Sequence, residues 1–149
     1  MRRIALVTVL ALALAAVSAG TASAAGKNGF FKTSNNRIWC GWGYGGGTGF
    51  VVCGIKNGYL KPKPKNTCKH IDYVGNRIAF NATGKAKIQP CAGDAGPFAN
   101  PKTTKVLAPG KTWSGGGMSC TAIKSSSVKC KNKSKHGFKM TTPGPYQLC

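Results

Sequence analysis

Acidic side chains are almost absent from this sequence. It contains no glutamate, and its only aspartates are Asp72 and Asp94, against 22 lysines and arginines. The formal net charge is +20, so internal ion pairs can neutralise almost none of it. A charge this one-sided favours binding to polyanions and opposes compaction through self-repulsion. Chemistry that needs paired carboxylates, such as glycoside hydrolysis, has only these two aspartates to draw on.

Helical stretches are also scarce. The 21 glycines and 8 prolines are spread so that few windows can hold three helical turns. The longest apolar run, residues 4–17, is shorter than the roughly 20 residues of a transmembrane helix. It follows two arginines and precedes Ala22-Ser23-Ala24, the small-x-small pattern that a signal peptidase cleaves. We therefore predict a signal peptide at residues 1–24, cleaved before Ala25, and a single exported domain at residues 25–149.

Seven cysteines lie in this exported part, where disulfides form and persist. Six of them fall into three sequence-local couples, although six cysteines can also pair in other ways. Facing strands of a hairpin bring two cysteines to the Cα spacing of about 5.5–6 Å that a bridge needs. The seventh, Cys149, is left as a free thiol or as a bridge between two copies of the chain, giving a dimer. The predicted bridges are Cys40–Cys53, Cys68–Cys91 and Cys120–Cys130.

Short β-branched or aromatic runs bounded by turn residues are the main structural signal. Asn81–Gly84 indicates a hairpin turn, Gly45–Gly49 the flexible tip of another hairpin, and Lys61–Lys65 an extended loop. We predict an all-β fold, a small and loop-rich antiparallel barrel or sandwich of disulfide-clamped hairpins. The expected strands lie at residues 37–40, 50–53, 77–80, 87–88, 105–107 and 128–130.

An ordered set of motifs runs through residues 30–146. The combination resembles a family of small secreted bacterial proteins of unknown function, with six cysteines in this order and a Gly-His-Gly-Phe signature. The chain departs from it at Lys135, where the signature has glycine, and at Cys149. The resemblance implies secretion and a disulfide framework, and it implies no activity. The motifs are Phe31-x-x-Ser34-Asn35-Asn36-Arg37-Ile38-Trp39-Cys40, Val52-Cys53, Cys91-Ala92-Gly93-Asp94, Cys120-Thr121 and Cys130-x-Asn132-x-x-x-His136-Gly137-Phe138.

Lysines recur with a period of two in three segments. On a strand, every second side chain points to the same face, about 6.6–7 Å from the next. Such ladders suit repeated contacts with a polyanionic chain, whereas lysines on an edge strand can simply prevent aggregation. With almost no counter-charge present, we predict a polyanion-binding surface. Its lysines are Lys129, Lys131, Lys133 and Lys135, with Lys61, Lys63 and Lys65 and with Lys85 and Lys87.

Aromatic residues surround the glycine-rich tip. Trp42, Tyr44 and Phe50 could stack on bases or sugars, or they could belong to the core of a small β protein. Trp39 is expected in the core.

The sequence therefore predicts a secreted or wall-associated cationic binder without enzymatic activity, metal or cofactor. Its expected partner is cell-wall polymer, nucleic acid or an anionic membrane, the last as an antimicrobial. A zinc site is disfavoured because no C-x-x-C spacing occurs. The alternative is a small secreted ribonuclease using His70 and His136 with a lysine. In that case His70-x-Asp72 would orient the imidazole on one face of a strand.

Overall fold

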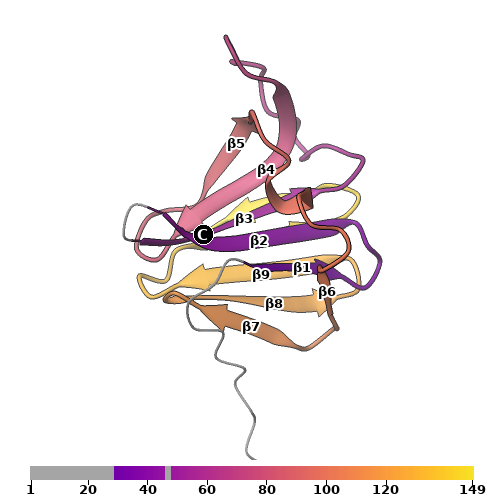
Figure 1. Cartoon of the computed structure of the whole chain (residues 1–149), viewed down its shortest axis with the longest axis vertical. Helices are drawn as coiled ribbons and strands as arrows, with labels where there is room; N and C mark the ends of the chain where they lie inside the picture. The colour runs from indigo at the N-terminus through magenta and orange to yellow at the C-terminus, as the bar shows by residue number, and fades with distance from the viewer. Residues whose placement is uncertain (1–28, 46–47) are drawn as a thin grey trace, which may run out of the picture.

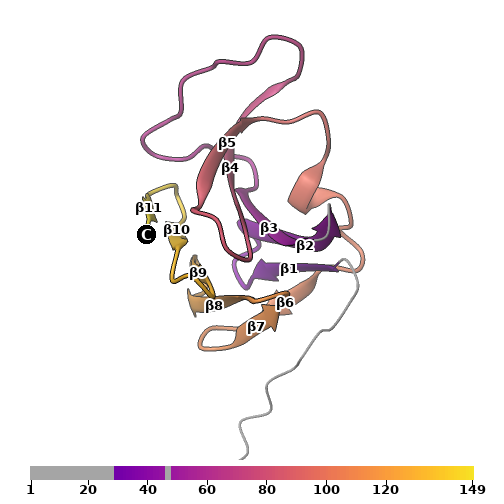
Figure 2. The ribbon, with the colours of Figure 1, turned by 90° about the vertical axis from the view of Figure 1, so that its left-hand side faces the viewer.

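The computed structural model describes residues 29–45 and 48–149. Within them lie eleven strands and one turn of 3₁₀ helix, arranged as two sheets packed face to face (Figures 1 and 2). The predicted signal peptide, its cleavage site at Ala25 and the tip of the Gly45–Gly49 loop lie outside the described residues. No helix in the described part is long and apolar enough to cross a membrane.

Six strands form the first sheet, sheet 1. Adjacent strands in this sheet are antiparallel, with one exception. β1 and β6 are parallel, and Phe31–Thr33 pairs in register with Lys105–Leu107. This pairing brings together segments about half the chain apart, and it departs from the purely antiparallel prediction. In spatial order the strands are β5 (Lys87–Cys91), β4 (Tyr73–Asn81), β3 (Thr48–Ile55), β2 (Ile38–Gly45), β1 (Gly29–Thr33) and β6 (Lys105–Leu107).

Five antiparallel strands form the second sheet, sheet 2, from the C-terminal third of the chain (Figure 1). The 3₁₀ helix η1 (Gly96–Phe98) precedes them and contacts β2 and β3 of sheet 1. In spatial order the strands are β11 (Tyr146–Leu148), β10 (Gly137–Thr141), β9 (Ser127–Asn132), β8 (Met118–Lys124) and β7 (Thr112–Gly115).

The all-β prediction is confirmed, and of its two forms the structure is the sandwich. No strand of one sheet pairs with a strand of the other in the described part of the chain. The sheets therefore keep separate edges and do not close into a barrel. Asn81–Gly84 does connect two antiparallel strands, β4 and β5, as predicted.

The core lies between the sheets and follows from strand alternation. In β3, Val51, Cys53 and Ile55 are buried, and in β9 Val128 and Cys130 are buried in the same every-second-residue pattern. Burying one such aliphatic side chain stabilises the fold by about 1.5–3 kcal/mol. Other members of the core are Phe31, Ile38, Leu60, Ile78, Phe80, Trp113, Met118, Phe138 and Met140.

All three predicted disulfides are present. Cys40–Cys53 joins β2 to β3, with Cα atoms 4.1 Å apart, and Cys120–Cys130 joins β8 to β9, with Cα atoms 4.0 Å apart. In each hairpin the two cysteines are direct register partners. Cys68–Cys91 ties the loop before β4 to the end of β5.

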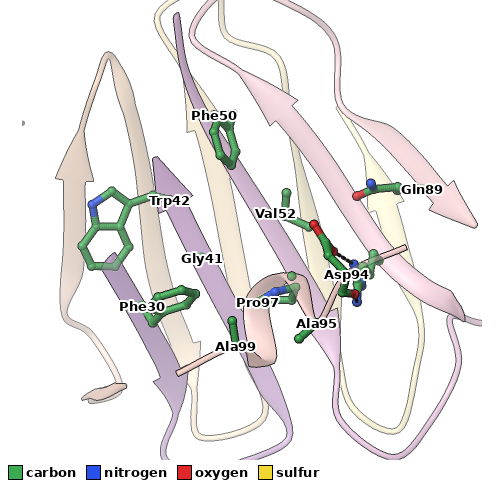
Figure 3. Close-up of a pocket in the computed structure, with 12 residues that line it drawn as sticks. Phe30, Gly41, Trp42, Phe50, Val52, Gln89, Asp94, Ala95, Pro97 and Ala99 are labelled. Atoms are coloured by element: carbon green, nitrogen blue, oxygen red, sulfur yellow. Dashed lines mark hydrogen bonds and ion pairs between the residues drawn. The ribbon is translucent and has the colours of Figure 1, made fainter. Parts of the chain in front are cut away.

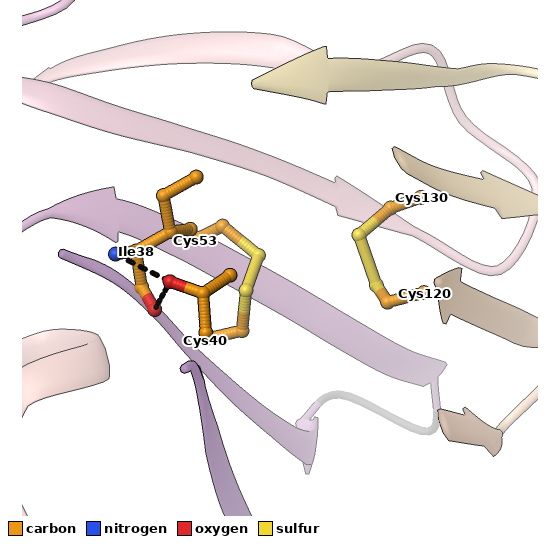
Figure 4. The surroundings of a disulfide bond; sticks show 6 residues. Ile38, Cys40, Cys53, Cys120 and Cys130 are labelled. Atoms are coloured by element: carbon orange, nitrogen blue, oxygen red, sulfur yellow. Dashed lines mark hydrogen bonds between the residues drawn. A yellow bond between two sulfur atoms is a disulfide. The ribbon is translucent and has the colours of Figure 1, made fainter. Parts of the chain in front are cut away.

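The two hairpin disulfides meet in the middle of the sandwich (Figure 4). The sulfur atoms of Cys53, Cys120 and Cys130 lie within 4.8 Å of one another. Because all three are oxidised in disulfides, they offer no thiolate to a metal ion. The cluster is therefore a structural junction between the sheets.

Candidate functional site

Strand β9 carries the first part of the predicted lysine ladder. Lys129 and Lys131 are exposed, while the residues that alternate with them, Val128, Cys130 and Asn132, are buried and point into the sandwich. The alternation holds because every second residue of a strand faces the same side. Both ammonium groups therefore lie on the outer face of sheet 2.

A row of polar side chains crosses sheet 2 at the level of Lys129. Lys139 of β10 is its direct register partner on one side, and Thr121 of β8 is its partner on the other. Gln147 of β11 lies beyond Lys139. Beyond Thr121 is Thr112 of β7, and the two hydroxyl oxygens are 2.8 Å apart, at hydrogen-bonding distance.

A second row crosses the sheet at the level of Lys131. Its partner in β8 is Ser119, which is paired in turn with Ser114 of β7. Together the two rows make a surface of ammonium, hydroxyl and amide groups. No aspartate or glutamate occurs from Ala95 to the end of the sequence. We call this surface the lysine face, defined as Lys129, Lys131, Lys139, Thr112, Ser114, Ser119, Thr121 and Gln147.

Only the first two of the four lysines lie on the strand. Strand β9 ends at Asn132, and Lys133 and Lys135 lie in the turn before β10. Lys135 has φ of 64°, the left-handed conformation of a turn and not that of a regular strand. Lys133 nevertheless lies beside the lysine face, because it lines an open hollow of about 330 Å³ together with Lys131.

Asn132 is the last residue of β9. The residue is 6% exposed, and its side-chain nitrogen donates to the backbone carbonyls of Asn81 and Gly84 at 2.9 and 2.8 Å. Its side-chain oxygen accepts a hydrogen bond from the backbone N–H of His136. The Asn132 side chain thus fixes the turn and fastens sheet 2 to the β4–β5 turn of sheet 1.

The residues after this turn also have structural roles. A Cβ on Gly137 would lie 2.0 Å from the carbonyl oxygen of Cys130, so only glycine fits. Phe138 is fully buried and packs edge-on against Phe80, with ring centroids 5.6 Å apart.

At the other end of the sandwich, the turn between β1 and β2 makes the matching attachment. The backbone N–H of Asn35 donates to the carbonyl of Ser125, and its side-chain nitrogen donates to the hydroxyl of Thr142. Its side-chain oxygen accepts from the hydroxyl of Thr33 and the backbone N–H of Arg37. Motif residues at both ends therefore hold the two sheets together.

The remaining predicted lysines belong to the sheet 1 side of the molecule. Lys85 lies in the β4–β5 turn and Lys87 begins β5, and both are exposed. Lys61 and Lys65 are exposed in the loop before β4.

Lys63 of the same loop has an aromatic partner. Its ammonium lies 4.1 Å from the ring centre of Tyr59 and 5.5 Å from that of Tyr73, a cation–π arrangement. The nine predicted lysines therefore do not form a single ladder. Lys139 completes the lysine face and escaped the sequence prediction, although its place in the alternating Gly137–Thr141 segment was a usable signal.

The histidines lie on separate loops. His70 is exposed in the segment before β4, and His136 is half-buried in the β9–β10 turn. Residues 70–72 are not in a strand, so the prediction that a strand would orient His70 toward Asp72 is wrong. The acidic side chain that does have a partner is Asp94, whose Oδ1 lies 2.9 Å from Nη1 of Arg77.

The two tryptophans near the glycine-rich tip are both largely shielded from solvent. Trp39 is 2% exposed, as expected, although it packs on the outer side of sheet 1 beneath the ammonium groups of Lys32 and Lys56. Trp42 is half-buried, with its ring centroid 4.8 Å from that of Trp113. The side chain of Tyr44 lies outside the described residues.

Cys149 is exposed and has no disulfide partner within the chain. Its backbone N–H and carbonyl both bond to Gly137, at 2.8 and 3.0 Å, so its backbone extends the edge of sheet 2 beyond β11.

Comparison with known proteins adds one result to this geometry. No curated protein and no solved structure matches the chain. Residues 5–146 match DUF6636, a family of unknown function. The match covers nearly the whole chain, including every strand of both sheets except the last two residues of β11, and the protein therefore belongs to the DUF6636 family.

Proposed function

We propose that the protein is an exported, non-catalytic binder of extended polyanions and that the lysine face is its binding surface. The observation that carries this proposal is the pairing of Lys129 with Lys139. Like charges directly opposite each other on a sheet destabilise it, and the lysine face contains no acid to relieve them. A bound anionic chain would remove that repulsion.

The position of these lysines argues against a purely protective role. Lysines that prevent sheet-to-sheet aggregation belong on edge strands. β9 and β10 are interior strands of sheet 2, whose edges are β7 and β11. The lysines of the lysine face therefore do not lie on an edge strand and cannot prevent pairing at a sheet edge.

The chemistry of the face suits phosphate or other anionic groups in a repeating chain. Lys129 and Lys131 are two residues apart on one strand, a separation of about 6.6–7 Å. The hydroxyls of Thr121 and Ser119 beside them can donate hydrogen bonds to anionic oxygens, as such side chains do at phosphates. Each row thus offers a charge and a neutral donor.

Binding should depend little on the sequence of the polymer. Bidentate reading of bases relies mainly on arginine and amide side chains. Beyond the predicted signal peptide the chain has two arginines, Arg37 and Arg77. Arg77 is 3% exposed and paired with Asp94, so it is not free to read a base.

The proposed place of action is outside the cell. The predicted signal peptide leads there, and three disulfides are typical of oxidising compartments. Anionic wall polymer, nucleic acid and anionic membranes are the polyanions that such a protein meets.

The test is a salt titration of binding to single-stranded DNA, used as a probe of defined charge. For single strands the slope of log affinity against log salt is about −0.7 per phosphate contact. The double variant Lys129→Ala/Lys139→Ala should flatten the slope by about 1.4. The matched control Lys85→Ala/Lys87→Ala removes the same charge from sheet 1 and should leave the slope nearly unchanged. Equal effects of the two pairs would refute the lysine face as the binding surface.

RNA in place of DNA tests the non-catalytic part of the proposal. Its support is that His70 and His136 lie on separate loops. We expect a retarded complex with intact RNA. Degradation that His136→Ala abolishes would instead establish the ribonuclease.

A further inference from the structure

The outer face of sheet 1 contains a hollow of about 270 Å³. Phe30 and Phe50 flank its floor, which is formed by Gly41 and Val52 (Figure 3). Residues 94–97 and Ala99, which include the first part of η1, form the opposite side. The volume lies just below the range of about 300–1,000 Å³ that is typical of ligand pockets, so the hollow suits one small ring-sized group.

A glycine makes this hollow possible. Gly41 is an outward-facing position of β2, and a Cβ there would lie 3.1 Å from the Phe30 ring and 3.5 Å from Cα of Pro97. Any larger side chain at this position would occupy the space between them. The aromatic edges and the bare backbone thus give an apolar floor.

One end of the hollow is polar, and two of its groups have no partner. Arg77 of β4 and Gln89 of β5 are direct register partners, and both line the hollow. Arg77 is 97% buried, since its side chain and backbone are only 3% exposed. Its Nε and the Oε1 of Gln89 are buried without a hydrogen-bond partner among the described residues. Buried polar atoms are nearly always hydrogen-bonded, so this pair points to a missing ligand.

The charge at this end is already balanced. Nη1 of Arg77 donates to Oδ1 of Asp94 at 2.9 Å, and Nη2 donates to the backbone carbonyl of Asp94 at 2.7 Å. The guanidinium therefore needs no anion from a ligand. The groups left over are one N–H donor and one carbonyl acceptor on neighbouring strands.

A secondary amide complements such a pair, because its carbonyl accepts a hydrogen bond and its N–H donates one. We propose that this hollow binds the acetamido group of an N-acetylated amino sugar. The amide carbonyl faces Nε of Arg77, the amide N–H faces Oε1 of Gln89, and the methyl group and the sugar ring lie on the apolar floor beside Phe30 and Phe50. This site is on the opposite sheet from the lysine face and recognises its ligand without net charge.

The experiment compares two neutral probes by isothermal calorimetry and by chemical-shift changes in NMR spectra. The first is the trimer of β-1,4-linked N-acetylglucosamine. The second is the matching glucose trimer, which has a hydroxyl in place of each acetamido group. We expect the wild-type protein to bind the first at millimolar concentrations or below and not to bind the second.

Two variants test the assigned contacts. Gln89→Leu removes the acceptor from a half-buried position and should weaken binding by about tenfold. Gly41→Ala fills the floor, and no positive φ at this residue opposes the change, so binding should be lost while the fold is retained. The control is Gly93→Ala, whose new methyl would meet only Ile71, at 3.7 Å, and which should bind normally.

Equal binding of both trimers, no binding of the acetylated trimer, or unchanged affinity in both variants would overturn the proposal. The comparison of probes needs no variant, so it remains decisive even if a substitution disturbs folding. Because the probes are uncharged, failure here leaves the polyanion proposal standing, and failure of the salt titration leaves this one standing.

Discussion

The two outer faces of the sandwich differ in charge and in surface shape. The face of sheet 2 is a regular array of lysine, serine and threonine side chains without an acid. The face of sheet 1 has a hollow in which the charge of Arg77 is matched by that of Asp94. Both sheets are built on a cysteine-clamped hairpin with the same inward pattern. One core can therefore carry two independent surfaces, because the side chains that a strand buries alternate with those that it exposes.

Glycine substitutions should show the largest difference in stability between changes in sheet 1 and changes in sheet 2. In Gly137→Ala the new Cβ would collide with the backbone of Cys130, 2.0 Å away, and backbone cannot move aside cheaply. We expect the free energy of unfolding to fall by about 3 kcal/mol. In Gly41→Ala of sheet 1 the neighbour is the movable ring of Phe30, so the loss should stay below about 1 kcal/mol. Urea denaturation of the oxidised proteins measures both, and equal losses would contradict this assignment.

The attachments between the sheets come next in size. Asn132→Ala removes a buried amide that donates to the carbonyls of Asn81 and Gly84, and we expect a loss of about 2 kcal/mol. Asn35→Ala removes the attachment at the opposite end, where the side chain is exposed to water, and should cost about 1 kcal/mol or less. The same denaturation experiment ranks the two variants, and the reverse order would show that Asn132 is not the stronger attachment.

The charge of the lysine face should have a smaller effect of opposite sign. Lys129→Thr removes the like-charged partner of Lys139 and should stabilise the protein by about 0.5 kcal/mol at low salt. Exposed charges are screened as the ionic strength rises, so the gain should fade in about 1 M NaCl. Lys87→Thr on sheet 1 is the control, because Lys87 is paired in register with Ala79 and should give no such gain. A gain that persists in high salt would mean that repulsion is not its cause.

The smallest effect should come from Cys149. It takes part in no disulfide within the chain, so Cys149→Ser should leave the unfolding of the monomer unchanged. We also propose that the exposed thiol links two copies of the chain. Non-reducing electrophoresis should then show a dimer in the wild type that disappears in the variant, and a dimer that persists would exclude this bond.

Much of the fold was predictable from the sequence. The predicted runs fall in β2, β3, β4, β5, β6 and β9, because those strands carry contiguous β-branched or aromatic residues. The disulfide pairing is confirmed; hairpin geometry accounts for Cys40–Cys53 and Cys120–Cys130, whereas Cys68 lies in a loop. The expected runs did not include β1, β7, β8, β10 and β11. In β7 and β10 the reason is that Thr112–Gly115 and Gly137–Thr141 mix glycine with polar residues. Their strands depend on buried Trp113 and Phe138, whose packing is a tertiary effect.

Less of the candidate site was predictable. The period of two at Lys129 and Lys131 correctly indicated one exposed strand face. It could not show the structural role of Asn132, because the side chain donates to carbonyl groups about 50 residues earlier in the chain. The hollow escaped prediction for the same reason, since Arg77 and Asp94 are brought together by the path of β4, β5 and the following loop.

The arrangement of the disulfides also determines how the chain is connected by covalent bonds. Two bridges lie wholly before residue 92 and the third wholly after residue 119, so none spans the exposed turn at residues 101–103. A protease that cuts this turn would produce two pieces without a covalent link, each still looped by its own bridges. The nicked protein would keep its shape only through non-covalent contacts, namely those between the sheets and the pairing of β6 with β1. In denaturant it would separate into two fragments without any reducing agent.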